Sequence, residues 1–92
     1  MRCTDKMKLY VSIPEELAAR NFSKTWKQIQ DRVKSKYPYS EIISRYTGNQ
    51  LEEANFVVFL YDYKENRTCV EDMQKCRELS IPYNFIVKIY AE

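Results

Sequence analysis

The apolar and polar segments along the 92-residue chain alternate in a way that predicts strands and helices in turn. Four short runs are rich in β-branched and aromatic residues, as strands are. They cover residues 7–13 (MKLYVSI), 39–47 (YSEIISRYT), 55–61 (NFVVFLY) and 83–90 (YNFIVKIY). The third run is almost continuously apolar, which is typical of a strand buried on both faces. We therefore expect four strands.

Two longer segments carry the spacing of helices. Over residues 15–36, apolar side chains recur on one face at helical intervals, and the segment ends before Pro38. These side chains are Ala18, Phe22, Trp26, Ile29 and Val33. A second helix is expected over roughly 68–79, where Cys69, Met73 and Cys76 form the apolar stripe. Residues 49–54 can add one or two helical turns.

The order of these elements predicts a single α/β domain over residues 1–92. Helices would cover both faces of a mainly parallel sheet of about four strands, in a small doubly wound fold of Rossmann-like or flavodoxin-like type. Such sheets bind ligands at the carboxyl ends of their strands, beside the loops that enter the helices. The loops at 12–16 (SIPEE) and 62–67 (DYKENR) are therefore the candidate site.

The composition excludes several kinds of chemistry. The chain has no histidine, which excludes a Ser-His or Cys-His nucleophile pair within one chain and the usual zinc sites. It has one glycine, Gly48, so it lacks a P-loop and a dinucleotide fingerprint. Three cysteines without metal-ligand spacing indicate reduced thiols in the cytoplasm, and we expect neither a metal nor a cofactor. A formal charge of +2 makes nucleic acid an unexpected partner, and no run is long enough to span a membrane.

The start of the second helix carries two adjacent acids with different expected roles. Thr68 and Glu71 have the spacing of a capping box, in which each side chain bonds to the other residue's backbone N–H. Asp72 lies beside the Met73 stripe, and from the first turn it can face the carboxyl edge of the sheet. Arg67 precedes this helix start, where anions bind, although it could equally be an ordinary loop arginine paired with a neighbouring glutamate.

One long segment carries a family resemblance. ANFVVFLYDYKENRTCVEDMQKCRELSIP, residues 54–82, resembles the second half of nucleoside 2-deoxyribosyltransferase-like domains, which include small phage and bacterial members. Those domains have an Ala-Asp-x-Val-Val-x strand, a loop ending in Ser-x-Gly, a catalytic glutamate, and a helix closing in Leu-Gly-x-Pro. Near the amino terminus, KLYVSIP (8–14) is similar to their first strand and its Ser-Gly-Pro turn. The resemblance covers about two-thirds of the chain.

The resemblance also implies positions for a pocket. The family's catalytic glutamate falls on Asp72, its phosphate- or sugar-binding serine on Asn66, and its base-orienting acid on Asp62. Tyr10 and Ser12 match residues that line the pocket from the first strand. With Arg67 added from its place at the helix start, the expected ligand-binding residues are Tyr10, Ser12, Asp62, Asn66, Arg67 and Asp72.

Departures from the family pattern bear on activity. Thr68 and Ile13 replace glycines of the family pattern, and Asp72 is one methylene shorter than glutamate. Misplacing a nucleophile on that scale can lower a rate by about a hundredfold. The pocket can therefore persist while turnover is lost.

Three functions follow from the resemblance. The first is binding of a nucleoside, a nucleotide or a nucleotide-derived signal, sequestered in the manner of phage proteins that oppose bacterial immunity. The alternatives are an active N-glycosidase or deoxyribosyltransferase with Asp72 as nucleophile, and a non-catalytic protein-interaction module. Family members complete their pockets with a neighbouring subunit, so the resemblance also implies a homodimer or a higher homo-oligomer.

Overall fold

The computed structural model describes residues 7–48, 50–63 and 66–89, with the backbone alone for 87–89. In chain order its elements are β1 (Met7–Ser12), α1 (Glu15–Ala18), α2 (Ser23–Lys36), β2 (Ser40–Ser44), the 3₁₀ helix η1 (Leu51–Glu53), β3 (Phe56–Asp62), α3 (Val70–Leu79) and β4 (Tyr83–Ile89). All four expected strands are present. Residue 90, at the end of the last predicted strand, and residue 49, at the start of the predicted helical turn, lie outside the described residues.

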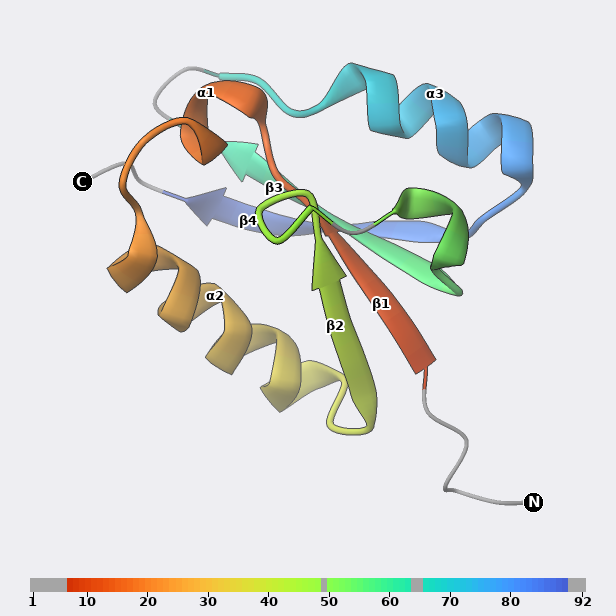
Figure 1. Ribbon diagram of the computed structural model, residues 1–92, viewed down its shortest axis with the longest axis horizontal. Coiled ribbons are helices and arrows are strands. Elements are labelled where there is room, and N and C mark those ends of the chain that lie inside the picture. Colours follow the sequence, from red (N-terminus) through yellow and green to blue (C-terminus); the bar gives the residue numbers. More distant parts are fainter. Residues whose placement is uncertain (1–6, 49, 64–65, 90–92) are drawn as a thin grey trace.

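The four strands form one sheet in the order β2-β1-β3-β4, and every pair of neighbours runs parallel (Figure 1). In the middle of the sheet, Leu9 of β1 pairs with Ile42 of β2 on one side and Phe56 of β3 on the other. The predicted α/β fold with a parallel sheet is confirmed. Because all four strands run in the same direction, their carboxyl ends meet at one edge of the sheet.

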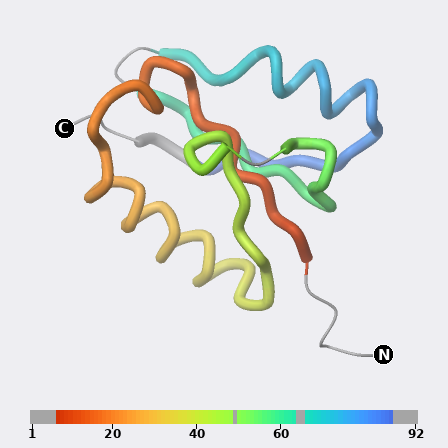
Figure 2. Tube along the Cα trace, in the orientation of Figure 1, coloured from red at the N-terminus to blue at the C-terminus, as the bar shows by residue number. Residues whose placement is uncertain are grey.

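Helices cover both faces of this sheet, with α2 on one side and α3 on the other (Figure 2). Successive side chains of a strand point to opposite faces, so β1 contributes to both cores. Leu9 and Val11 pack in the core under α2, whereas Tyr10 packs in the core under α3. The core under α2 also contains Leu17, Phe22, Ile29, Val33, Val58 and Leu60. The core under α3 also contains Ile43, Leu51, Val57, Phe59 and Cys76.

The segment expected to form one helix over 15–36 forms two helices instead, α1 and α2. The backbone leaves helical geometry at Phe22, where φ is −125° and ψ is 38°. Ser23 then begins α2, and its hydroxyl donates a hydrogen bond to Oδ1 of Asn21 (3.0 Å). Because of this break, α1 stays beside the carboxyl edge of the sheet while α2 runs along the face below it. Burial of the Phe22 ring in the core stabilises the break.

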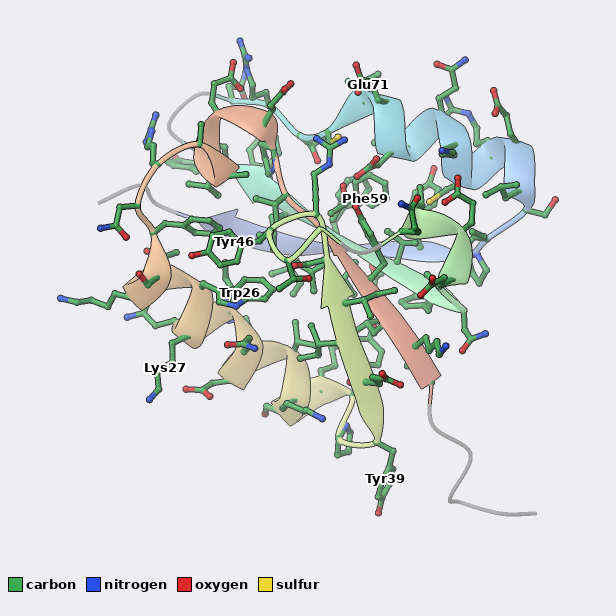
Figure 3. The ribbon with its side chains drawn as sticks, viewed as in Figure 1. Trp26, Lys27, Tyr39, Tyr46, Phe59 and Glu71 are labelled. Carbon is green, nitrogen blue, oxygen red and sulfur yellow. The ribbon has the colours of Figure 1, made fainter. Side chains whose placement is uncertain are left out.

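Trp26, which was expected in the core, lies at its margin. It is half-buried, and its ring contacts the ring of Tyr46 with centroids 5.3 Å apart (Figure 3). Lys27, the next residue of α2, points away from the sheet. The apolar face of α2 is therefore narrower than the sequence spacing suggested, and an aromatic pair closes its edge.

Helix α3 begins at Val70, two residues later than expected, and the predicted capping box is wrong. Thr68 lies before the helix, and its hydroxyl donates to the carbonyl oxygen of Leu60 in β3 (2.9 Å). The side chain of Glu71 is 86% exposed and projects from the outer side of α3 (Figure 3). This hydrogen bond ties the loop to the sheet. It also directs the Thr68 hydroxyl away from the backbone N–H groups that a helix cap would bind.

Candidate functional site

Buried polar side chains mark the carboxyl edge of the sheet. Ser12, Ser44 and Asp62 are the last residues of β1, β2 and β3, and all three are fully buried. Polar groups at such positions require hydrogen-bond partners, because burying them without partners is costly. The candidate site develops from the partners that these strand ends find in the adjoining loops and in α3.

Asp72 of α3 is the centre of this arrangement. It occupies the first turn of the helix, where the helix dipole favours a negative charge, and only 6% of the residue is exposed. Its Oδ2 accepts a hydrogen bond from the hydroxyl of Ser12 (2.7 Å). Arg45 approaches the same carboxylate, with Nε 3.3 Å from Oδ2 and a terminal nitrogen 3.4 Å from Oδ1. The acid therefore links β1, the turn after β2, and α3.

The turn after β2 positions Arg45. The hydroxyl of Ser44 accepts a hydrogen bond from the backbone N–H of Thr47 (3.2 Å), and the Thr47 hydroxyl donates to the Ser44 carbonyl (3.0 Å). Gly48 follows with a φ of 84°, a conformation that L side chains rarely adopt. The strand predicted over 39–47 is therefore shorter, and its last residues make the turn that directs Arg45 across the sheet edge towards α3.

Tyr10 and Cys69 surround the Arg45–Asp72 pair, and the pKa of each is raised. Burial raises the pKa of Tyr10 to about 12, with the negative charge of Asp72 acting in the same direction; a hydrogen bond with Arg45 opposes the shift. Burial also raises the pKa of the Cys69 thiol, again reinforced by the charge of Asp72. At neutral pH both groups are uncharged. Neither group therefore adds a negative charge beside the Arg45–Asp72 pair.

A pocket of about 220 Å³ opens beside this cluster, at the carboxyl edge of the sheet. One wall consists of residues 14–16 at the start of α1, and the opposite wall consists of residues 67–71 at the start of α3. Arg45 reaches the pocket between them. Ligand pockets commonly measure about 300–1,000 Å³, so this one accepts a small molecule or part of a larger one.

The structure places the six residues expected at the site in different ways. Tyr10, Ser12 and Asp72 gather around Arg45, yet Ser12 and Asp72 lie behind the pocket wall rather than in it. Arg67 lines the pocket, and its guanidinium forms an ion pair with Glu16 of α1.

Asn66 and Asp62 lie outside the pocket wall. Asn66 is exposed in a left-handed conformation (φ 58°), and its side-chain oxygen accepts a hydrogen bond from the Tyr61 hydroxyl. Asp62 is buried at the end of β3, where its backbone exchanges two hydrogen bonds with that of Arg67 (2.9 and 3.2 Å). Asp62 therefore fixes the loop that carries Arg67.

The sequence interpretation missed Arg45 and Glu16. Arg45 directly follows a strand, which could have indicated the carboxyl edge. The turn after β2 leads into a 3₁₀ helix rather than an α-helix, so it was not counted among the ligand-binding loops. Glu16 belongs to the candidate loop 12–16 but was not singled out, and the structure pairs it with Arg67.

No known protein-family model, curated protein or solved structure matches this chain. The resemblance to nucleoside 2-deoxyribosyltransferase-like domains is thus neither supported nor contradicted by other proteins. Within residues 7–48, 50–63 and 66–89, no three acidic or cysteine side chains are grouped so as to hold a metal ion. No helix among the described residues is both long and apolar enough to cross a membrane.

Proposed function

We propose that this domain binds a nucleoside or nucleotide-type small molecule in the pocket between α1 and α3. The observation that carries the proposal is the Arg45–Asp72 pair, in which a buried carboxylate holds a guanidinium at the pocket wall. A guanidinium fixed in this way is pre-organised for a phosphate, because less side-chain entropy is lost when the ligand binds. The pocket also borders the start of α3, and the amino-terminal end of a helix favours anions.

The walls supply the complementary groups for a sugar. Glu71 lines the pocket, and a carboxylate accepts hydrogen bonds from sugar hydroxyls, as an acid does for ribose in dinucleotide-binding folds. The volume of about 220 Å³ suits a sugar phosphate better than a whole nucleotide. A second subunit that covers the open side would extend the pocket over the base, so the proposal includes a homodimer or higher homo-oligomer.

The geometry favours holding the ligand over converting it. A catalytic nucleophile needs an accessible carboxylate, and the Asp72 carboxylate is buried behind Arg45 and hydrogen-bonded to Ser12. A protein that binds without turnover acts by sequestering its ligand. Nucleotides are abundant in the cytoplasm, so the proposal also assigns the protein to that compartment.

Calorimetric titration with nucleosides and nucleoside 5′-monophosphates tests the proposal, with released base followed by chromatography. We expect saturable binding, and we expect Arg67→Gln to weaken the binding of a 5′-monophosphate by about 10- to 150-fold, the equivalent of one charge-assisted hydrogen bond. Arg32→Gln is the matched control, because Arg32 is exposed on α2 and outside the pocket. Absence of binding to the whole panel would refute the proposal. Release of base would refute sequestration in favour of catalysis.

A further inference from the structure

The positive charges of the pocket already have partners in the protein itself. Arg67 forms an ion pair with Glu16, which lies fifty-one positions earlier in the chain and on the opposite wall. Arg45 is paired with Asp72, and a terminal nitrogen of Arg45 lies 3.9 Å from a carboxylate oxygen of Glu71. An anion that binds a guanidinium here therefore competes with a carboxylate that the protein already supplies.

The two ion pairs differ in how readily an incoming anion can replace the carboxylate. The carboxylate of Asp72 is buried and also bound by Ser12, so its replacement would break a network. The side chains of Glu16 and Arg67 are each half exposed, and exposed ion pairs contribute little to stability. Rotation of the Glu16 side chain into solvent breaks this ion pair. The exchange therefore takes place at Arg67.

We infer that Glu16 is a specificity-determining residue, which occupies the anion position of Arg67 until a phosphate monoester replaces it. The inference rests on the proposed function and names the class of ligand. A neutral nucleoside cannot replace a carboxylate at a guanidinium, and a singly charged phosphodiester exchanges one negative charge for another. A phosphate monoester carries nearly two negative charges at neutral pH, because its second pKa is about 6, so it gains most from the exchange.

The neighbouring Glu15 provides a matched control. Both glutamates belong to α1 and line the pocket, and replacing either by glutamine changes the net charge by the same amount. Glu16 forms the ion pair with Arg67. A general effect of charge would appear in both variants, whereas release of Arg67 would appear in Glu16→Gln.

Calorimetric titration with ribose 5-phosphate, which carries the phosphate and the sugar without a base, tests the inference. We expect Glu16→Gln to bind it about two- to fivefold more tightly than the natural chain, the range set by an exposed ion pair. Glu15→Gln should gain clearly less. In an Arg67→Gln background, Glu16→Gln should have no more effect than Glu15→Gln, since a double-mutant cycle isolates the pairwise interaction.

The outcomes separate this inference from the proposed function. The role of Glu16 is overturned if Glu15→Gln and Glu16→Gln gain the same affinity for ribose 5-phosphate, or if Glu16→Gln gains none. Binding of ribose 5-phosphate by the natural chain would still support the pocket in that case. Binding of nucleosides without binding of ribose 5-phosphate also overturns the inference and leaves the pocket standing. If no variant binds ribose 5-phosphate, nucleosides or nucleotides, both fail.

Discussion

The hydroxyl of Ser12 donates a 2.7 Å hydrogen bond to Oδ2 of Asp72, a residue sixty positions further along the chain. The bond joins the end of β1 to the first turn of α3, and Arg45 adds the turn after β2 through the same carboxylate. A buried acid that bonds to a hydroxyl and a guanidinium is both neutralised and satisfied. The contact therefore fixes the geometry of the sheet edge on which the pocket is built.

Replacing Asp72 by asparagine should lower the free energy of unfolding by about 1.5–3 kcal/mol, the range for a hydrogen bond to a charged group. The amide can still accept the Ser12 hydroxyl, but it no longer balances the charge of Arg45. Urea denaturation measures the change. Glu71→Gln is the control, because this neighbouring acid is exposed and its loss should change stability by less than about 0.5 kcal/mol. Equal effects of the two variants would contradict the central place of Asp72.

The fold was predictable because it depends on patterns within short segments. The apolar run of β3 and the stripe of α3 identify their elements without knowledge of the rest of the chain. The break between α1 and α2 was not predictable, since it depends on the burial of Phe22 under a sheet that the local sequence does not describe.

The site was predictable in part for the same reason. That Asp72 faces the carboxyl edge follows from its angle around the helix. Its partner Arg45 comes from a distant turn, and the ion pair of Glu16 with Arg67 joins residues fifty-one positions apart. Contacts between distant segments decide both, and a pattern of residue types does not specify them.

Thr68 offers a direct test of the corrected start of α3. Thr68→Val keeps the shape of the side chain but removes the hydroxyl that donates to the Leu60 carbonyl, so it should lower the free energy of unfolding by about 0.5–1.5 kcal/mol. Thr68→Ser retains the donor and should remain close to the natural protein. Thermal or urea unfolding compares the two. If Thr68→Val kept the stability of the natural protein while Thr68→Ser lost stability, the hydroxyl would have no role and the methyl group would account for the contribution of this side chain.

The end of α3 contains a strained residue that can be relieved. Ser80 has a φ of 57° and a ψ of 40°, a left-handed conformation that costs a non-glycine residue about 1–2 kcal/mol. Ser80→Gly should raise the free energy of unfolding by about 0.5–1 kcal/mol, because the greater entropy of glycine in the unfolded chain offsets part of the gain. Gly48→Ala should instead lower the free energy of unfolding. Gly48 has a φ of 84°, and a Cβ there would meet no atom within 4 Å, so backbone strain alone would act.

For Ser80 and Gly48 the measurement is urea denaturation of both variants beside the natural chain. Ser80→Ala serves as the control, because alanine removes the hydroxyl without relieving the left-handed backbone. A gain in Ser80→Ala as large as that in Ser80→Gly would show that the side chain, and not the backbone, is the source of the strain.

Tyr10 makes the stability of the fold depend on alkaline pH. Burial raises its pKa in the folded protein to about 12, compared with 10.0 for an unperturbed tyrosine. The folded state therefore keeps the phenol protonated where the unfolded state begins to lose the proton. The stabilisation is complete below about pH 10, and it is lost as the pH rises towards the folded-state pKa. Between pH 10 and 12, the natural chain should lose about 2 kcal/mol more than Tyr10→Phe.

Urea unfolding at a series of pH values from 9 to about 12 measures the difference between the two slopes. The other tyrosines and the lysines titrate in both proteins, so their contributions cancel in the comparison. Tyr39→Phe is the control: Tyr39 is 68% exposed, and its removal should leave the slope of the natural chain unchanged. Parallel curves for the natural chain and Tyr10→Phe would mean that water reaches the phenol. Tyr10 would then lie outside the buried cluster that holds Asp72 and Arg45.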